Sequence, residues 1–429
     1  MKWVRIQSGW QRTETKKGVY DFGWLDEIVD QLIARGMTPW MCLCYGNGLY
    51  GGPAQEVFGA VGCPPIQTQE QRDAWLRYCV ATAAHFRGRV DHLEIWNEPD
   101  GKGTWKYDRG AKSYTEFAIA TAQALRQGNP DCYIIGGSMI RVNLPFLSEC
   151  FRLGLADCID AVSFHAYHFD DRKIRGNIRA LRGLIRMYNP SLEIIQGESG
   201  AQSRPFGHGA MYYGGWTPRK QAKYLLRHMI ADLGLGVKFS SYFSCLDMAE
   251  AHNGRVGDPQ SHSDFAYFGV LGATLDETGV ATGEYAPKPS YYALSTLASL
   301  LHGNVEAIDL PIMVEDDLAK HCGNIPSLSS GDVESYAFAL DDGSLALAYW
   351  HHTDLMTTDF ESAVTLRCAA LGDVRLVDPM DGTVYELPPE ILQRDAADNI
   401  TLSLLPIRDY PLLLLFEGTQ ASQNKRHGI

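Results

Sequence analysis

The sequence predicts an α/β protein in which a (β/α)8 barrel is followed by an antiparallel β-sandwich. Three observations lead to this fold class. Short apolar segments alternate with amphipathic segments up to about residue 302, polar residues stand where several apolar segments end, and the pattern changes from residue 303 onward. Strands that alternate with helices indicate a parallel sheet with crossover helices, either a barrel or an open doubly wound sheet.

Seven apolar segments in the first part of the chain are predicted to be strands. They are KWVRIQ, TPWMCLCYGN, HLEIWNE, CYIIGGS, DAVSFHAY, LEIIQGE and VKFSSYFS. Amphipathic helices are expected between them. In residues 24–36, for example, Leu25, Val29 and Leu32 lie on one helical stripe, and Gly36 ends the helix. Seven strands are one fewer than a closed barrel needs. We therefore expect that the first strand–helix unit is missing from this chain, or that another segment closes the gap.

The second part of the chain has the pattern of an antiparallel β-domain. Strand-like segments of alternating polarity are separated by Asp-Gly and Asp-Asp-Gly turns, which is typical of a small sandwich. The predicted organisation is a barrel over residues 1–302, a sandwich over 303–417 and a flexible polar tail over 418–429.

Composition and charge exclude several classes of partner. The chain has 38 Lys and Arg residues against 51 Asp and Glu residues, a net charge of −13. This balance argues against nucleic acid and against an anionic membrane surface, because both require a basic face. No segment approaches the ~20 apolar residues of a membrane helix. The ten cysteines show no paired metal-ligand spacing, so we expect reduced thiols, a cytoplasmic location and no metal or organic cofactor. Homo-oligomerisation stays open.

Two glutamates close buried apolar strands. Glu98 ends HLEIWNE before Pro99, and Glu198 ends LEIIQGE. In a βα barrel, the carboxyl ends of the strands meet at one mouth. Burial raises the pKa of a carboxyl group unless a partner keeps it ionised. Two carboxyl groups with different pKa values are what acid-assisted cleavage of an acetal requires. Alternatively, each glutamate is an ordinary strand-end residue paired with an arginine.

These motifs resemble the retaining glycoside hydrolases of clan A, whose signature is Asn-Glu-Pro after an apolar strand and a second glutamate about three βα units later. EIWNEPD, followed by TWKYDRGAKSYTEFAIATAQAL, looks most like family 39, the β-xylosidase and α-L-iduronidase family. The resemblance covers roughly residues 1–300 as a fold pattern, and a C-terminal sandwich suits the same family. It implies that Glu98 is the acid/base, that Glu198 is the nucleophile and that Asn97 binds the 2-hydroxyl of the substrate. Strict alternation would put Asn97 and Glu98 on opposite faces, so we expect the strand end to twist or bulge.

The same resemblance assigns three further polar residues. In VSFHAY, His165 and Tyr167 share one face of the strand. Tyr167 would donate a hydrogen bond to Glu198, and His165 would line the sugar site near Glu98. Arg5 in KWVRIQ matches the arginine of the clan's second strand, and its charge would lower the pKa of Glu198.

Aromatic candidates for sugar stacking are less well defined. The clan usually carries a tryptophan on its last strand as a floor for the sugar, but VKFSSYFSCLD has none. Tyr242 or Phe243 could take this place, as could Trp216 in the long loop after Glu198. Trp10 is a further stacking candidate.

The sequence therefore predicts a retaining glycoside hydrolase that cleaves β-linked, xylosidase-like bonds in a carbohydrate substrate by double displacement. Two alternatives remain. An endo-acting polysaccharide hydrolase of a sister clan A family would release oligosaccharides instead of monosaccharides. A carbohydrate-binding pseudoenzyme would bind glycans without turning them over.

Overall fold

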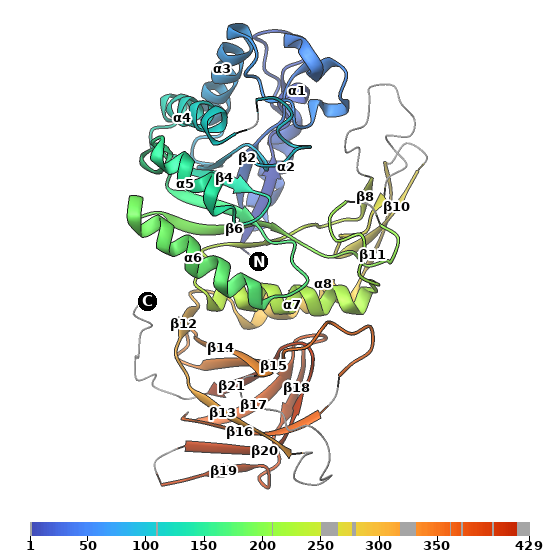
Figure 1. Ribbon diagram of the computed structural model, residues 1–429. Helices are drawn as coiled ribbons and strands as arrows, with labels where there is room; N and C mark the ends of the chain where they lie inside the picture. Colours follow the sequence, from blue (N-terminus) through green and yellow to red (C-terminus); the bar gives the residue numbers. More distant parts are fainter. Residues whose placement is uncertain are drawn as a thin grey trace.

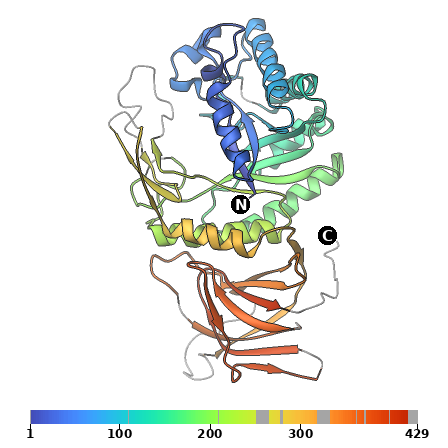
Figure 2. The same cartoon turned by 180° about the vertical axis from the view of Figure 1, so that it is seen from behind.

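The protein consists of a parallel α/β unit and an antiparallel β unit, stacked one above the other (Figure 1). The computed structural model describes residues 2–108, 110–207, 209–249, 265–276, 280–317, 332–360, 362–369, 372–396 and 399–417. The tail predicted at residues 418–429 lies outside them. In both views, helices α7 and α8 run between the two units (Figures 1 and 2).

One seven-stranded sheet forms the core of the first unit. All its neighbouring strands are parallel and follow one another in sequence order. The strands are β1 (Trp3–Gln7), β2 (Thr38–Leu43), β3 (His92–Ile95), β4 (Tyr133–Met139), β5 (Ala161–His165), β6 (Glu193–Ser199) and β7 (Ser240–Tyr242). Each of the seven predicted strand segments overlaps one of them, and β4 and β6 each extend one residue beyond the predicted segment.

Helices connect the strands and cover the outside of the sheet. They are α1 (Trp10–Thr13), α2 (Gly23–Ala34), α3 (Gln69–His85), α4 (Ala111–Gly128), α5 (Leu144–Arg152), α6 (Arg172–Tyr188), α7 (Pro218–Gly234) and α8 (Pro289–Leu300), with short 3-10 helices at Gly48–Tyr50, Gly52–Gln55, Phe58–Ala60 and Leu155–Asp157. Local sequence explains where they begin. A capping box between Thr68 and Gln71 starts α3, and Thr217 followed by Pro218 starts α7.

The sheet curves into a nearly closed barrel. In the described residues, β1 and β7 are its two edges and do not pair with each other. Their amino-terminal ends still approach, because the rings of Trp3 and Phe239 lie 4.2 Å apart. Trp40, Ile135 and Ile195 complete an apolar plug there. These findings confirm the predicted barrel class, and they leave the opposite end of the barrel, where the strands have their carboxyl ends, as the open mouth.

Two small antiparallel pairs follow β7 and were not predicted from the sequence. They are β8 (Met248–Ala249) with β9 (Phe265–Ala266), and β10 (Leu271–Leu275) with β11 (Ala281–Pro287). Their strands are short or largely exposed, so they lack the buried alternation that identifies a core strand.

The second unit is the predicted β-sandwich, built from two antiparallel sheets. The first has the order β12 (Glu306–Ile308), β14 (Val333–Ala339), β15 (Leu345–His351), β21 (Leu412–Glu417), β17 (Asp373–Asp378), β18 (Thr383–Glu386). The second has the order β13 (Ile312–Asp316), β16 (Ser362–Ala369), β20 (Asn399–Ile407), β19 (Leu392–Arg394).

Helix α7 joins the barrel to the sandwich. Its apolar residues share one hydrophobic core with α8 and both sheets. Lys223 is fully buried and pairs with buried Asp409 at 2.8 Å. Gly234 lies so close to Tyr336 that a Cβ atom would stand 2.0 Å from its ring. The boundary near residue 302 falls between α8 and β12 and stays a prediction.

None of the described helices combines the length and the apolar character that crossing a membrane requires.

Asp232 on α7 makes the stability of this fold dependent on pH. Its carboxyl group is buried, and burial raises its pKa to about 7, although a hydrogen bond from Ser240 opposes the shift. The folded protein therefore keeps this proton up to about pH 7, whereas the unfolded chain releases it near pH 4. Between these values the free energy of unfolding falls as pH rises, by up to about 1.4 kcal/mol per pH unit from this group.

We therefore expect Asp232→Asn to be more stable than the unaltered protein at pH 8, by about 4 kcal/mol, and equal to it near pH 3. Urea unfolding at several pH values measures this, with Asp354→Asn, at an exposed aspartate, as the control. A constant difference at every pH would contradict the assignment.

Candidate active site

The end of β3 presents Asn97 and Glu98 on a broken strand. The strand stops at Ile95, and Trp96 and Glu98 adopt left-handed backbone angles, with φ +65° and +53°. The backbone N–H of Glu98 donates to Ser138 O at 2.8 Å, and the indole N–H of Trp96 donates to Thr104 O at 2.8 Å. The regular alternation of side chains between two faces is therefore lost at this strand end, as the sequence led us to expect. Asn97 and Glu98 both line one cleft.

Glu198 on β6 faces the same cleft and receives two hydrogen bonds. The hydroxyl of Tyr167 donates to its Oε1 at 2.5 Å, and Arg5 Nη1 donates to its Oε2 at 3.1 Å. The strand pairing of β6 shifts register beside it on both sides, as is common next to active sites. The preceding residue must be small, because a Cβ atom at Gly197 would stand 2.4 Å from the hydroxyl of Ser163.

Arg5 connects these groups through one planar side chain. Its Nη2 donates to Asn97 Oδ1 at 2.9 Å, and its Nε donates to Glu94 Oε2 at 2.6 Å. With its Oδ1 already bound, Asn97 is left with its amide N–H groups as donors toward the cleft. The guanidinium therefore orients three side chains from strands β3 and β6.

Glu94 was not recognised from the sequence as part of the site. It is fully buried and also accepts hydrogen bonds from Trp40 Nε1 at 3.1 Å and Ser138 Oγ at 2.9 Å. Burial alone would raise its pKa, but the charge and hydrogen bond of Arg5 outweigh burial and hold the pKa below its ordinary value. The sequence contained one sign of its role: Glu94 stands in the middle of an apolar strand, and burying a carboxylate costs free energy unless a partner pairs with it.

His165 lies between the two candidate catalytic carboxylates. Its Nδ1 is 2.8 Å from Glu98 Oε1 and 4.0 Å from Glu198 Oε2. Burial alone would lower its pKa, but the charge of Glu198 and the hydrogen bond to Glu98 raise it above the ordinary value. The imidazole Nδ1 can therefore donate a hydrogen bond to Glu98 when that carboxyl group is ionised and accept one from it when it is protonated.

The cleft around these residues has a volume of about 700 Å³, within the usual range for ligand sites. Phe243, Tyr242 and Phe268 form its aromatic wall. The Phe243 and Phe268 rings are 5.4 Å apart, and Phe268 lies 5.9 Å from Tyr167. A second hollow of about 380 Å³ adjoins it and shares Tyr45 and Val61 as lining residues.

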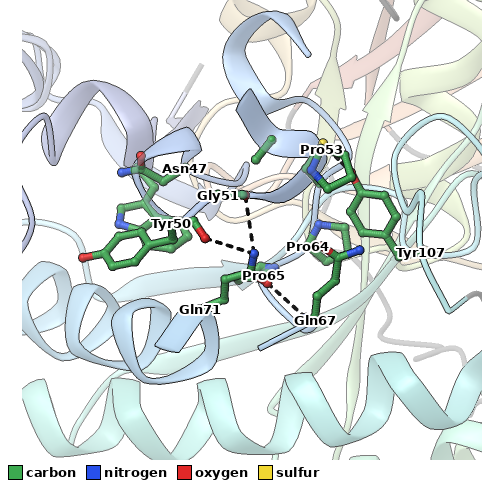
Figure 3. Close-up of a pocket in the computed structure, with 12 residues that line it drawn as sticks. Asn47, Tyr50, Gly51, Pro53, Pro64, Pro65, Gln67, Gln71 and Tyr107 are labelled. Atoms are coloured by element: carbon green, nitrogen blue, oxygen red, sulfur yellow. Dashed lines mark hydrogen bonds between the residues drawn. The ribbon is translucent and has the colours of Figure 1, made fainter. Parts of the chain in front are cut away.

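Trp10, predicted to stack on sugar, does not line this cleft but borders the second hollow. Its ring is fully buried and stacks on Tyr50 at 5.5 Å and on Tyr78 at 5.7 Å, and its N–H donates to Glu14. It also borders a cavity of about 10 Å³ in the loop after β2, where Gln71 donates to the backbone of Tyr50 (Figure 3). That volume is about the size of one water molecule. The contacts of the Trp10 ring are those of a packing residue, and its contact with sugar stays a prediction.

Trp216 is likewise placed differently from the prediction. It is 1% exposed, and its ring stacks on Phe169 at 5.7 Å. Lys220 Nζ lies 5.1 Å from the centre of the ring, and the indole N–H donates to Met211 O at 2.6 Å. Both indoles were predicted as sugar contacts because the sequence placed them in loops. Trp10 instead begins α1, Trp216 stands in the loop before α7, and both rings are buried.

Two groups of side chains have donor atoms close enough to hold a cation, among the residues that the structure describes. They are Glu98, His165 and Glu198, and Asp170, Asp171 and His352, in each of which the donor atoms lie within 4.8 Å of one another. An arginine already pairs with each group, Arg5 with Glu198 and Arg227 with Asp171. These guanidinium groups supply the positive charge that a metal would bring. The expectation of a reaction without metal or cofactor stays a prediction.

Comparison with known proteins agrees with this fold. Residues 3–178 match the family model described as Glycosyl hydrolases family 39. A family 39 glycoside hydrolase from the gut symbiont Bacteroides cellulosilyticus WH2 has a TM-score of 0.67 at 19% identity, over 97% of this chain and 76% of that one. A monomeric β-xylosidase from Caulobacter crescentus CB15 gives 0.58 at 17%, over 97% and 89%. A family 39 enzyme from Xanthomonas axonopodis pv. citri gives 0.57 at 19%, over 96% and 87%.

The barrel, its carboxylate-lined mouth and the family match together define a glycosidase. The chain is a glycoside hydrolase, and it resembles family 39. Its substrate is accordingly a carbohydrate.

Glu94→Gln should disturb both stability and activity, because it removes the buried one of the two carboxylates that pair with Arg5. Breaking a buried ion pair costs about 3–5 kcal/mol, and we expect kcat/KM to fall at least about tenfold as Asn97 and Glu198 lose their alignment. The folded pKa of Glu94 is depressed, so its stabilisation is present above the ordinary pKa and is lost as pH falls through the folded value. The stability gap between the two proteins should therefore be full at pH 7 and close in strong acid.

Denaturant unfolding and steady-state kinetics measure these effects. Glu193→Gln is the control. It makes the same change at the first residue of β6, at the end of that strand away from Glu198, on a side chain that is 42% exposed, and it should leave kcat/KM unaltered. If Glu94→Gln behaved like this control, Arg5 would hold its position without the buried carboxylate.

Proposed function

We propose that the chain is a retaining glycosidase that cleaves β-linked, xylosidase-like bonds by double displacement. One observation carries the proposal: an oxygen of Glu98 and an oxygen of Glu198 lie within 4.8 Å of each other in one cleft. Carboxyl groups of retaining enzymes are about 5–5.5 Å apart, whereas inverting pairs are separated by about 6.5–9.5 Å to admit a water molecule. One of the similar structures is that of a β-xylosidase, which supports the choice of linkage.

Glu198 takes the role of nucleophile. Arg5 and Tyr167 each donate to one of its oxygens, so two hydrogen bonds hold this carboxylate in place in the cleft. The carboxylate attacks the anomeric carbon and forms a glycosyl-enzyme. Asn97, oriented by Arg5, donates to the 2-hydroxyl of the sugar, a contact that strengthens as positive charge develops on the ring.

Glu98 takes the role of acid and then of base. It bonds to His165, whereas Glu198 bonds to Arg5. In the first step Glu98 protonates the leaving oxygen. In the second step it removes a proton from the water that hydrolyses the glycosyl-enzyme. Nδ1 of His165 donates a hydrogen bond to Glu98 when the carboxyl group is ionised and accepts one when it is protonated.

Azide rescue of two alanine variants tests these roles. With nitrophenyl β-xyloside, we expect Glu198→Ala to lose turnover and to regain it with added azide, giving the inverted α-xylosyl azide. Glu98→Ala should slow hydrolysis by about 10²–10⁴-fold for a poor leaving group, and azide should give the retained β-xylosyl azide. The stereochemistry of the products is read by NMR.

The matched control is Glu193→Ala, which removes a carboxylate from the opposite end of the strand that carries Glu198. It should keep normal turnover. Absence of rescue in both variants would count against the assignments, and binding of glycosides without turnover by the unaltered protein would indicate a pseudoenzyme.

A further inference from the structure

We propose that Phe169, Tyr212 and Tyr213 form an aromatic platform at the rim of the cleft that binds sugar units beyond the bond being cleaved. The substrate would then be an oligosaccharide chain longer than a disaccharide. This inference rests on the proposed function and extends it by naming the class of substrate.

The platform consists of exposed rings in contact with one another. Phe169 is 40% exposed, Tyr212 58% and Tyr213 63%. The Tyr212 and Tyr213 rings lie 4.9 Å apart at 81°, and the Phe169 and Tyr213 rings lie 5.2 Å apart at 34°. A contiguous exposed apolar patch on a soluble fold commonly marks a binding surface.

A rigid base holds these rings in place. Phe169 stacks on buried Trp216, whose indole N–H is fixed to Met211 O. Between the rings, Gly214 lets the chain approach closely, because a Cβ atom there would stand 2.7 Å from Phe169 and 2.8 Å from Trp216. The carbonyl of Gly214 also accepts a hydrogen bond from Lys220 at 2.6 Å. The platform is therefore organised before a ligand arrives, which reduces the entropy lost on binding.

The platform lies next to the reacting carboxylates. Phe169 follows Tyr167 by two residues, so their Cα atoms are at most about 7 Å apart, and the hydroxyl of Tyr167 bonds to Glu198. Ala210, two residues before Tyr212, lines the cleft itself. Both segments thus reach the mouth from the Glu198 side. A sugar chain that extends past this side of the cleft would meet them.

The chemistry of the platform suits a neutral glycan. Pyranose rings present apolar C–H faces that stack on aromatic rings, and the phenol hydroxyls of tyrosine bond to sugar hydroxyls. An exposed aromatic patch can also bind a second copy of the same chain. Continuity with the cleft favours the glycan, because an interface between copies would obstruct the entrance to the site.

The test compares substrates of increasing length. The probes are nitrophenyl β-xyloside and β-1,4-xylo-oligosaccharides of two to six units. In Tyr212→Ala/Tyr213→Ala, the ratio of kcat/KM for the hexamer to kcat/KM for the nitrophenyl glycoside should fall about tenfold or more. The matched control is Tyr291→Ala/Tyr292→Ala on α8, a similar pair that is 42% and 51% exposed with rings 5.6 Å apart at 88°. Its ratio should equal that of the unaltered protein.

An equal ratio in all three proteins would overturn the platform. So would light scattering that shows a dimer in the unaltered protein and a monomer in the Tyr212/Tyr213 variant, since the patch would then be an interface between copies. Failure of the proposed function looks different, because no protein would turn over any xyloside. Calorimetric titration with xylohexaose and xylobiose then decides: tighter binding of the hexamer that is lost only in the Tyr212/Tyr213 variant supports the platform, and any other result overturns it.

Discussion

The guanidinium of Arg5 is the interaction on which the active-site geometry depends. It donates to Glu94, Asn97 and Glu198 from a single rigid plane, at 2.6, 2.9 and 3.1 Å. A lysine could supply the charge but not the fixed angles of this fork. Arg5 stands on β1, one edge of the sheet, whereas its partners stand on or directly after β3 and on β6. The interaction therefore also holds the edge strand against the interior of the barrel.

The sandwich supports the same site from a distance. Helix α7 follows the loop that carries Trp216, and its Lys223 and Arg227 are buried against groups outside the barrel sheet. Lys223 pairs with Asp409 of the second unit. Helix α7 packs its apolar residues into the sandwich core and its Tyr224 against Trp216 of the loop. The loop between Glu198 and α7 is therefore held at one end by β6 and at the other by a helix fixed to the sandwich.

Sequence patterns located the polar residues of the site well, for a physical reason. Glu98, Glu198, His165 and Tyr167 each stand at or just after the end of an apolar strand, and in a parallel barrel such ends must converge. Their chemical roles remain predictions. Glu94 was missed because its strand was taken as purely apolar, although only its partner Arg5, distant in the sequence, makes its burial possible.

The loops were less predictable than the strands. Trp10 and Trp216 were expected to meet sugar, yet the contacts that bury them come from Tyr50, Tyr78 and Phe169, and no local pattern encodes these contacts. The pairs β8–β9 and β10–β11 escaped notice because short, exposed strands carry little periodic signal.

The left-handed backbone at Trp96 and Glu98 lowers the stability of the fold at the positions that carry the polar groups of the cleft. A non-glycine residue in this conformation costs on the order of 1 kcal/mol, which the surrounding structure must absorb. Glycine at position 98 would remove that strain together with the carboxyl group. Selection for a more heat-resistant chain therefore works against the carboxyl group at residue 98, the acid/base of the proposed mechanism, and more stable descendants would gain their stability elsewhere in the fold.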